Sequence, residues 1–443
     1  MLSPKSAETV RATLPAVAAA IGEVAPLFYE KLFAAHPELL RDLFNRAHQA
    51  DGSQREALAG SIAAFAGHLL DHPDERPDAL LDRIAHKHAS LGVREDQYPI
   101  VRTHLFAALA EVLGDAVTDE VAAAWDEVYW LMANGLIAAE RRLYAAAGTP
   151  DGDTWRTYRV AGRVAETDEV ATFFVRPADG KPVPPSRPGQ YVSVQVELAD
   201  GAHQIRQYSL SGQPDGGLQF SVKRVPGGEP APGVATPAGE VSGHLHDHVH
   251  EGDTLRVSAP FGEVVLDEGD GPLLFATAGI GCTPAIGMLA HLAAAGSPRR
   301  IIAAHADRTP TTHAFRDDLH HLVDKLPNAT AEVWYERPEP DAAATGGLAT
   351  GGLAIDDRAT GDQATGDQAD TAGPGAADAA GPDRTPTVRQ GLIDLGALEI
   401  PPGTIAYLCG PVPFMKAARA QLLASGVRPA DLHYEVFGPD LGL

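Results

Sequence analysis

The stretch RIAHKHASLG, residues 83–92, places two histidines two positions apart in a segment with helical periodicity. Neighbours two apart on a helix are rotated by about 200°, so His86 and His88 cannot both face a core. Ile84 and Leu91 are apolar and stand four and three positions from His88. This spacing predicts that His88 lies on the apolar face of the helix and that His86 lies with the polar residues.

A buried neutral imidazole needs partners for its ring nitrogens. The spacing around His88 leaves two interpretations open. In one, His88 is a core histidine that is hydrogen-bonded to a backbone carbonyl. In the other, it is a ligand to a metal.

The bulk composition narrows the possible functions. The chain has 443 residues, a formal net charge of −24 and 44% hydrophobic residues. That length predicts two or three domains. The negative charge argues against nucleic acid or an anionic membrane surface as a partner. Two cysteines, Cys282 and Cys409, give no disulfide framework, and the opening MLSPKSAETVRATL lacks the apolar run of a signal peptide. We therefore expect a protein of the reducing cytoplasm.

Three segments differ in texture and predict a multidomain protein. Residues 1–147 are rich in alanine and carry apolar residues at helical spacing, which predicts an all-α domain. Residues 153–266 alternate apolar and polar positions between Gly and Pro, which is typical of antiparallel β structure. In residues 270–443, strand-like and helix-like segments alternate, which predicts an α/β domain with a largely parallel sheet.

Two stretches of the third segment are unusual. Residues 272–298 contain no Asp, Glu, Lys or Arg before Arg299, but glycines and a proline interrupt them, so we expect a strand, a glycine turn and a helix instead of a membrane span. Residues 338–386 consist mainly of Ala, Gly, Thr, Asp and Pro, with the tandem repeats ATGGLATGGL and ATGDQATGDQ. Such a stretch has too little apolar surface to order itself, so we expect a disordered insert.

Several segments of the helical part resemble the haem-binding half of the flavohaemoglobins. They are PLFYEKLFAAHPELLRDLF at 26–44, SQREAL at 53–58, and AHKHASL followed by EDQY within 85–98. The resemblance extends over the whole chain. It implies that residues 1–147 form a globin that binds haem b.

The resemblance also implies roles for individual residues of the globin part. His88 would be the axial ligand of the haem iron, with Lys87 beside it in the haem site. Phe44 would pack on the haem face. Tyr29 and Gln54 would lie on the opposite side, where O2 binds.

Tyr98 and Glu140 match the residues that flank the axial histidine in that family. A carboxylate that is hydrogen-bonded to the far N–H of an axial imidazole makes the ligand more electron-donating. The resemblance therefore implies a site built for oxygen activation. Without it, Tyr98 would be interpreted as part of a helix end and Glu140 as a solvated carboxylate.

The β segment contains PGQYVSV and IRQYSL, which resemble the flavin site of the ferredoxin–NADP⁺ reductase-like family. In that family the arginine meets the pyrophosphate, the tyrosine lies against the isoalloxazine, and the serine hydroxyl bonds the ring edge. The resemblance implies an FAD-binding β-barrel over residues 153–266. The matching residues are Tyr191, Arg206, Gln207, Tyr208 and Ser209.

The segment GEVSGHLH at 239–246 matches a helix start whose backbone N–H groups meet phosphate in the same family. Gly239, Val241 and Ser242 carry that match. The residues before it, 228–239, depart from the family pattern, so we expect an added surface loop there that leaves the exact phosphate contacts open.

Two histidines in HLHDHVH, His244 and His248, have a spacing that zinc sites use. No acidic or cysteine ligand set accompanies them. We therefore expect this segment to be a helix near the flavin and not a metal site.

The third segment carries two further motifs and a tail that resemble the reductase family, which implies an NAD(P)-binding α/β domain over residues 270–443. The glycine turn TAGIGCTP allows a pyrophosphate to approach a helix start closely. The family uses CGPVPFM at 409–415 in the nicotinamide site, and HYEVFGP covers the flavin. The residues concerned are Gly279, Ile280, Gly281, Cys282, Thr283, Pro284, Cys409, Gly410, Pro411, Glu435, Val436, Phe437, Gly438 and Pro439.

Together these signals resemble a full-length flavohaemoglobin and imply NAD(P)H- and O2-dependent oxidation of nitric oxide to nitrate, with haem b and FAD as cofactors. We expect a monomer with the small molecules O2 and nitric oxide as ligands, without nucleic acid or stable membrane insertion. One alternative is a globin that binds or senses O2 or nitric oxide, whose reductase only keeps the haem ferrous. A second is a flavin reductase that has lost haem, against which His88 argues. The choice between NADH and NADPH stays open, and Arg308 is a candidate for a 2′-phosphate contact.

Overall fold

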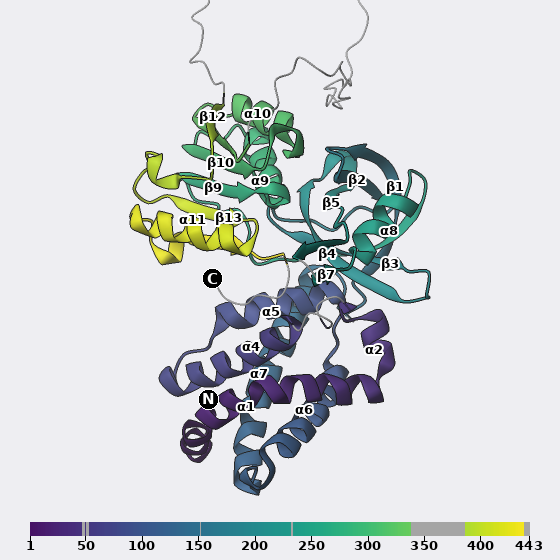
Figure 1. The fold of residues 1–443 in the computed structure, drawn as a ribbon, viewed down its shortest axis with the longest axis vertical. Coiled ribbons are helices and arrows are strands. Elements are labelled where there is room, and N and C mark those ends of the chain that lie inside the picture. The colour runs from purple at the N-terminus through teal and green to yellow at the C-terminus, as the bar shows by residue number, and fades with distance from the viewer. Residues whose placement is uncertain (47–48, 50–52, 151, 232–233, 338–385, 438–443) are drawn as a thin grey trace, which may run out of the picture.

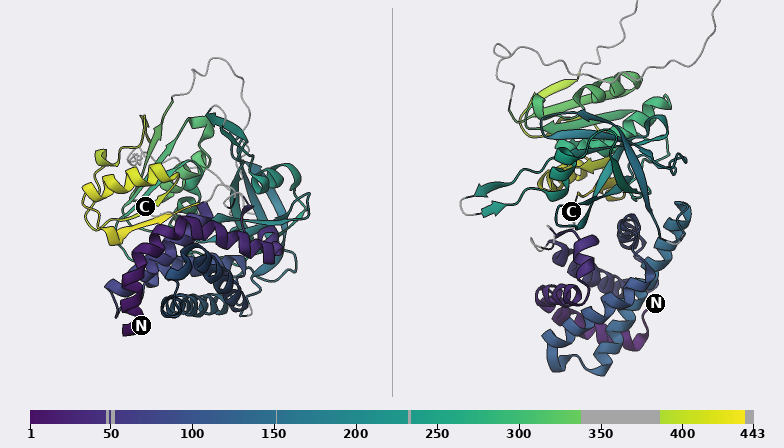
Figure 2. Two further views of the ribbon diagram at one scale, coloured as in Figure 1. Left: turned by 60° about the horizontal axis from the view of Figure 1, so that its bottom comes forward. Right: turned by 90° about the vertical axis from the view of Figure 1, so that its right-hand side faces the viewer.

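The computed structural model describes residues 1–46, 49, 53–150, 152–231, 234–337 and 386–437. A helical body lies below two sheet-containing bodies, with helix α5 at the top of the helical body beneath both sheets (Figure 1). Two further views show the same separation (Figure 2). The predicted insert at 338–386 lies outside the described residues except for its last residue.

The helical body is built from six α-helices among the described residues. They are α1 (Pro4–Ala35), α2 (Pro37–Asp42), α4 (Ser53–Asp71), α5 (Asp78–Leu91), α6 (Tyr98–Leu113) and α7 (Asp119–Ala146). Short 3₁₀ turns lie at Glu95–Gln97 and Gly114–Ala116. The expectation of an all-helical first segment is confirmed.

Helix α1 is continuous although Pro15 and Pro26 lie inside it. Each proline removes one backbone hydrogen bond, but the apolar stripe that includes Val17, Val24 and Phe28 is buried in the core and holds the helix together. Among the described residues, α1 is the one helix that is long and apolar enough to cross a membrane by length and composition. Its stripe packs against the other helices of this body.

Helix α5 ends at Gly92, which has a φ of 76° and accommodates the left-handed backbone that closes the helix. Ile84, His88 and Leu91 line the same cavity, so the predicted face is confirmed for His88. His86 lies on another face of α5 and does not line the cavity. Its Nδ1 accepts a hydrogen bond from the backbone N–H of Gly262, at 2.9 Å, in the neighbouring β domain.

The second body is a closed barrel with strand order β1-β2-β5-β4-β3-β8, which confirms the expected antiparallel β-barrel. Its strands are β1 (Trp155–Ala165), β2 (Val170–Pro177), β3 (Tyr191–Glu197), β4 (His203–Gly212), β5 (Leu218–Lys223) and β8 (Thr254–Ser258). Helix α8 (Glu240–His248) packs against it. The expected addition before α8 contains a hairpin, β6 (Gly228–Ala231) and β7 (Val234–Thr236).

The third body is a parallel sheet with strand order β12-β11-β10-β9-β13-β14. The strands are β9 (Leu273–Ala278), β10 (Ile301–Asp307), β11 (Ala329–Tyr335), β12 (Thr387–Gln390), β13 (Ile405–Cys409) and β14 (Leu432–Glu435). The helices are α9 (Thr283–Ala294), α10 (Arg316–Lys325) and α11 (Val412–Ala424). The uncharged run after Pro272 is the predicted strand, turn and helix.

Alternate residues of β9 serve opposite faces of this sheet. Leu273 and Phe275 pack in the cluster that contains α9 and α10, whereas Leu274 and Ala276 pack in the cluster that contains α11. A sheet that is covered on both faces explains why its strands are almost continuously apolar.

The helical body and the barrel share a small apolar cluster. Ala89 and Tyr144 from the helices pack with Tyr191, Ala259 and Phe261 from the barrel, and all five are buried. Hydrophobic burial therefore stabilises the contact between the two bodies as well as the core of each body.

Candidate functional site

A cavity of about 1560 Å³ extends from the helical body, across the boundary between the two bodies, to the barrel and the end of β14. Its walls are mainly apolar on the helical side. Several predicted site residues line it: Tyr29, Phe44, Lys87, His88, Tyr98, Tyr191, Arg206, Gln207, Tyr208, Ser209, Gly239, Val241, Ser242, Ile280, Thr283, Glu435, Val436 and Phe437.

His88, Tyr98 and Glu140 form one hydrogen-bonded group. Nδ1 of His88 lies 2.8 Å from Oε1 of Glu140 and 3.1 Å from the Tyr98 hydroxyl, which donates to the same carboxylate oxygen at 2.6 Å. Burial, together with the neighbouring carboxylate, raises the pKa of Tyr98, so its hydroxyl stays protonated as a donor. These contacts occupy Nδ1 and leave Nε2 of His88 as the ring nitrogen free to bind iron.

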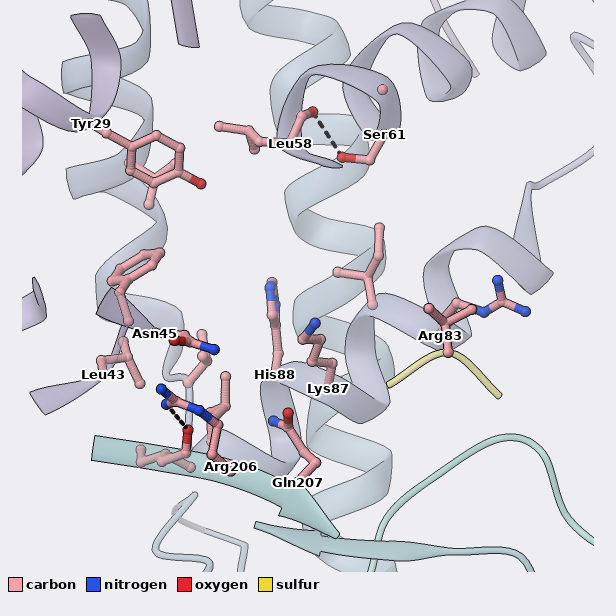
Figure 3. A pocket seen from close by; sticks show the side chains of 18 of the residues that line it. Tyr29, Leu43, Asn45, Leu58, Ser61, Arg83, Lys87, His88, Arg206 and Gln207 are labelled. Carbon is pink, nitrogen blue, oxygen red and sulfur yellow. Dashed lines mark hydrogen bonds between the residues drawn. The ribbon is translucent and has the colours of Figure 1, made fainter. Parts of the chain in front are cut away.

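Aromatic rings form the far wall of the same cavity. Tyr29 is buried, and its ring meets those of Phe33 and Phe44 at centroid distances of 5.5 and 5.8 Å. Figure 3 shows the hydroxyl of Tyr29 and the ring of His88 pointing into the same space. Gln54 lies in the first turn of α4, and its side chain is outside the described residues.

Strand β4 brings the flavin motif up against the histidine helix. Figure 3 shows Gln207 rising from this strand toward Lys87 and His88, whereas the guanidinium of Arg206 turns to the side of Asn45. The side chain of Arg206 donates to the carbonyl of Ile205 at 2.7 Å, and burial lowers the pKa of its guanidinium. A partly desolvated cation at this place is suited to bind an anionic group such as a pyrophosphate.

Ser209 and Tyr191 face each other across strands β4 and β3. The Ser209 hydroxyl is buried and has no hydrogen-bond partner among the described residues. Since a buried polar group without a partner is costly, it points to a ligand that supplies one. Tyr208 stacks on Phe220 at a centroid distance of 5.6 Å, which fixes its ring at the cavity wall.

Replacing Ser209 with alanine should weaken FAD binding by about three- to tenfold, the value of one lost hydrogen bond. The flavin-free protein should keep its free energy of unfolding, because the hydroxyl has no protein partner to lose. FAD titration by fluorescence and thermal unfolding measure both quantities. Ser211 is the matched control, since its hydroxyl is also buried and unpartnered among the described residues but does not line the cavity. Equal FAD affinities in the two variants would contradict this role for Ser209.

The start of α8 is closely packed against the chain around Val225. Gly239 precedes the helix, and a Cβ on it would lie 2.5 Å from the Ser242 hydroxyl oxygen and 3.0 Å from Val225. The Ser242 hydroxyl donates to the carbonyl of Gly239 and accepts from the N–H of Val225. Only glycine lets the chain at position 239 lie this close to Ser242 and Val225.

The two nicotinamide motifs meet in the third body. A Cβ on Gly281 would lie 2.5 Å from the carbonyl oxygen of Cys409 and 2.7 Å from the nitrogen of Gly410, so the turn after β9 packs directly on the turn after β13. Burial raises the pKa of both Cys282 and Cys409, which argues against either as a nucleophile. The remaining motif residues, Gly279, Pro284 and Pro411, lie in the same two turns.

The tail after β14 reaches the cavity through Glu435, Val436 and Phe437. Gly438 and Pro439 lie outside the described residues. Among the residues that are described, no cluster of His, Cys, Asp or Glu suits a metal ion, and His244 and His248 only contact each other edge to face.

Sequence reasoning missed the side chains that join the bodies at this cavity. Arg83 on α5 donates to Glu263 of the barrel at 2.9 Å and to the Tyr434 hydroxyl at 3.2 Å, with its guanidinium 4.6 Å from the Tyr434 ring centroid. Arg308, the candidate for a 2′-phosphate, pairs with Glu169 at 3.2 Å. Polar residues on a helix face or in a loop give no local signal that another domain covers them.

Comparisons with known proteins agree with this arrangement. The globin family model matches residues 27–136. A flavohemoprotein from Bordetella pertussis is 40% identical over 450 residues, which cover 99% of each chain, and one from Chromobacterium violaceum is 38% identical over 100% of both. The crystal structure of flavohemoglobin from Malassezia yamatoensis with bound FAD and heme superposes with a TM-score of 0.80 at 31% identity, over 99% of this chain and 100% of that one. With a helical globin body, a barrel and a parallel-sheet body in the same order, the chain belongs to the flavohemoprotein family.

Proposed function

We propose that this protein is a nitric oxide dioxygenase, which uses NAD(P)H and O2 to convert nitric oxide into nitrate with haem b and FAD as cofactors. The observation that carries the proposal is the buried carboxylate of Glu140 on the Nδ1 side of His88. A carrier of O2 has no need of an electron-rich axial ligand, whereas turnover that passes through oxidised iron is favoured by one.

The cavity fits both cofactors. Its apolar helical end, with Nε2 of His88 available, suits a haem that Phe44 and Lys87 flank. The unpartnered Ser209 hydroxyl and the position of Gly239 in the cavity wall at the start of α8 suit FAD. We assign the haem to residues 1–147, the flavin to 153–266 and NAD(P)H to 270–443. When bound, FAD would supply hydride acceptance from NAD(P)H and release of single electrons, and haem would supply the chemistry with O2.

The chain's own residues orient and shield this chemistry. Glu140 and Tyr98 hold the proton at Nδ1 of His88 and fix the plane of the ring. Tyr29 offers a hydroxyl donor on the opposite side, where O2 and nitric oxide would enter. Phe44 excludes water beside it, and Phe33 stacks on the Tyr29 ring from outside the cavity lining.

The location and assembly of the protein form part of the proposal. Both cysteines are buried and unbridged, which supports a place in the reducing cytoplasm. We propose that the protein acts as a monomer.

The test is an aerobic nitric oxide electrode assay on the purified holoprotein, with NAD(P)H followed at the same time. Because forming nitrate from nitric oxide and O2 takes one electron and a hydride supplies two, we expect two nitric oxide molecules consumed per NAD(P)H, with nitrate as the product. An anaerobic sample is the control. Consumption that stops at one nitric oxide per haem would instead support the alternative, a binding or sensing globin whose reductase only keeps the haem ferrous.

A further inference from the structure

Gln204 is a buried glutamine of β4 whose side chain reaches into the helical body. It is 0% exposed and lies two residues before Arg206 of the flavin motif. Its amide donates to the carbonyls of Arg41 at 3.0 Å and Phe44 at 3.2 Å, and its oxygen accepts from the N–H of Arg46 at 3.3 Å.

These bonds replace the C-terminal cap that usually satisfies the last carbonyls of a helix. The last carbonyls of a helix have no partners within it and are commonly satisfied by a glycine cap or by water. Helix α2 ends at Asp42, the residue that caps it is Leu43 and not glycine, and the helix has no buried residue of its own. The position of the turn after α2 therefore depends on the amide of Gln204.

Charged residues add to this contact, and their side chains are partly exposed to solvent. His203 binds Asp42 through its backbone N–H and through Nδ1, each at 3.2 Å. Arg46 pairs with Asp200 at 2.6 Å and with Glu240 at 3.0 Å, and both carboxylates are largely exposed. Solvent-exposed ion pairs contribute little, so the buried amide is the stronger constraint.

The turn carries Phe44, which meets Tyr29 edge to face at the cavity wall. We infer that Gln204 is a positioning residue that sets Phe44 over the haem from the flavin-binding strand. Because Gln204 and Arg206 lie two residues apart on β4, we expect occupancy of the flavin site to change the position of Phe44. The inference rests on the proposed function only in placing haem beside Phe44 and flavin beside Arg206.

The test compares full-length, haem-loaded proteins with and without FAD. Gln204→Glu keeps the acceptor for the N–H of Arg46 but sets a carboxylate against two carbonyl oxygens, and Gln204→Met serves if that variant does not fold. We expect the association rate of CO with dithionite-reduced haem to change by about threefold or more, because a displaced Phe44 alters access to the haem. In the parent protein that rate should also differ between the FAD-loaded and FAD-free forms, and in the variants it should not.

Gln213→Glu, an exposed change just past the end of the same strand, is the matched control and should leave CO binding unchanged. Combined with Phe44→Leu, the Gln204 change should have no further effect, because both act through one ring. A lower melting temperature with unchanged CO kinetics, or additive effects in the double variant, would overturn the inference. Since nitric oxide is not used, these outcomes are independent of the dioxygenase assay.

Discussion

Replacing His88 with alanine should yield a protein that binds no haem but still reduces an artificial electron acceptor with NAD(P)H at nearly the parental rate. His88 is the histidine of α5 that lines the cavity with its Nδ1 already engaged, so its loss removes the nitrogen available to iron. The flavin and nicotinamide motifs lie in other bodies, so the lesion should stay local. Soret absorbance per flavin and a ferricyanide reduction assay measure the two effects.

His86→Ala is the matched control for that experiment. Its ring accepts a hydrogen bond from Gly262 instead of facing the cavity, so the variant should keep its haem and lose only about 1 kcal/mol of stability. A haem-replete His88→Ala protein, or an equal loss of haem in both variants, would refute the assignment of the two faces of α5.

Replacing Glu140 with glutamine should keep haem content and flavin reduction normal while nitric oxide consumption falls roughly tenfold or more, the usual effect of losing a partner of a metal ligand. The carboxylate accepts from both His88 and Tyr98, so a neutral amide makes the imidazole less electron-donating. The haem midpoint potential should therefore rise. Stopped-flow reduction, a nitric oxide electrode and a redox titration on this one variant measure each quantity.

Glu127→Gln provides the comparison on the same helix. Its carboxylate accepts hydrogen bonds from Ser3 at the start of α1 and makes none to His88 among the described residues. The haem midpoint potential and the nitric oxide turnover should therefore remain parental. If Glu140→Gln also kept its potential and its full turnover, the carboxylate would have no electronic role. The ligand-binding alternative would then be favoured.

The sequence predicts the parts of this protein better than their junctions. The spacing of Ile84, His88 and Leu91 is enough to orient α5, because helical periodicity is a local property. The pairing of His88 with Glu140, 52 positions away, depended on family resemblance and not on periodicity. The FAD and nicotinamide turns were recognisable because glycine is required wherever backbone must approach closely, as at Gly281.

The junction residues show why the rest could not be predicted. Arg83, His86 and Gln204 have the polarity of ordinary surface positions, and each gains its partner only when one domain docks on another. Docking geometry is a property of whole surfaces, which a window of neighbouring residues does not encode. For this reason the spacing in α5 placed His86 with the polar residues but could not identify Gly262 as its partner.

The apolar cluster shared by Ala89, Tyr144, Tyr191, Ala259 and Phe261 bears on how such a protein can be taken apart. Cutting the chain near residue 150 would leave each fragment with an exposed apolar patch where the other fragment had packed. A haem half made alone would tend to stick to itself or to other proteins unless Tyr144 were exchanged for a hydrophilic residue. A reductase from another protein could be fused to this globin only if its surface carried apolar residues that pack on Ala89 and Tyr144. The globin and reductase parts are therefore not freely exchangeable.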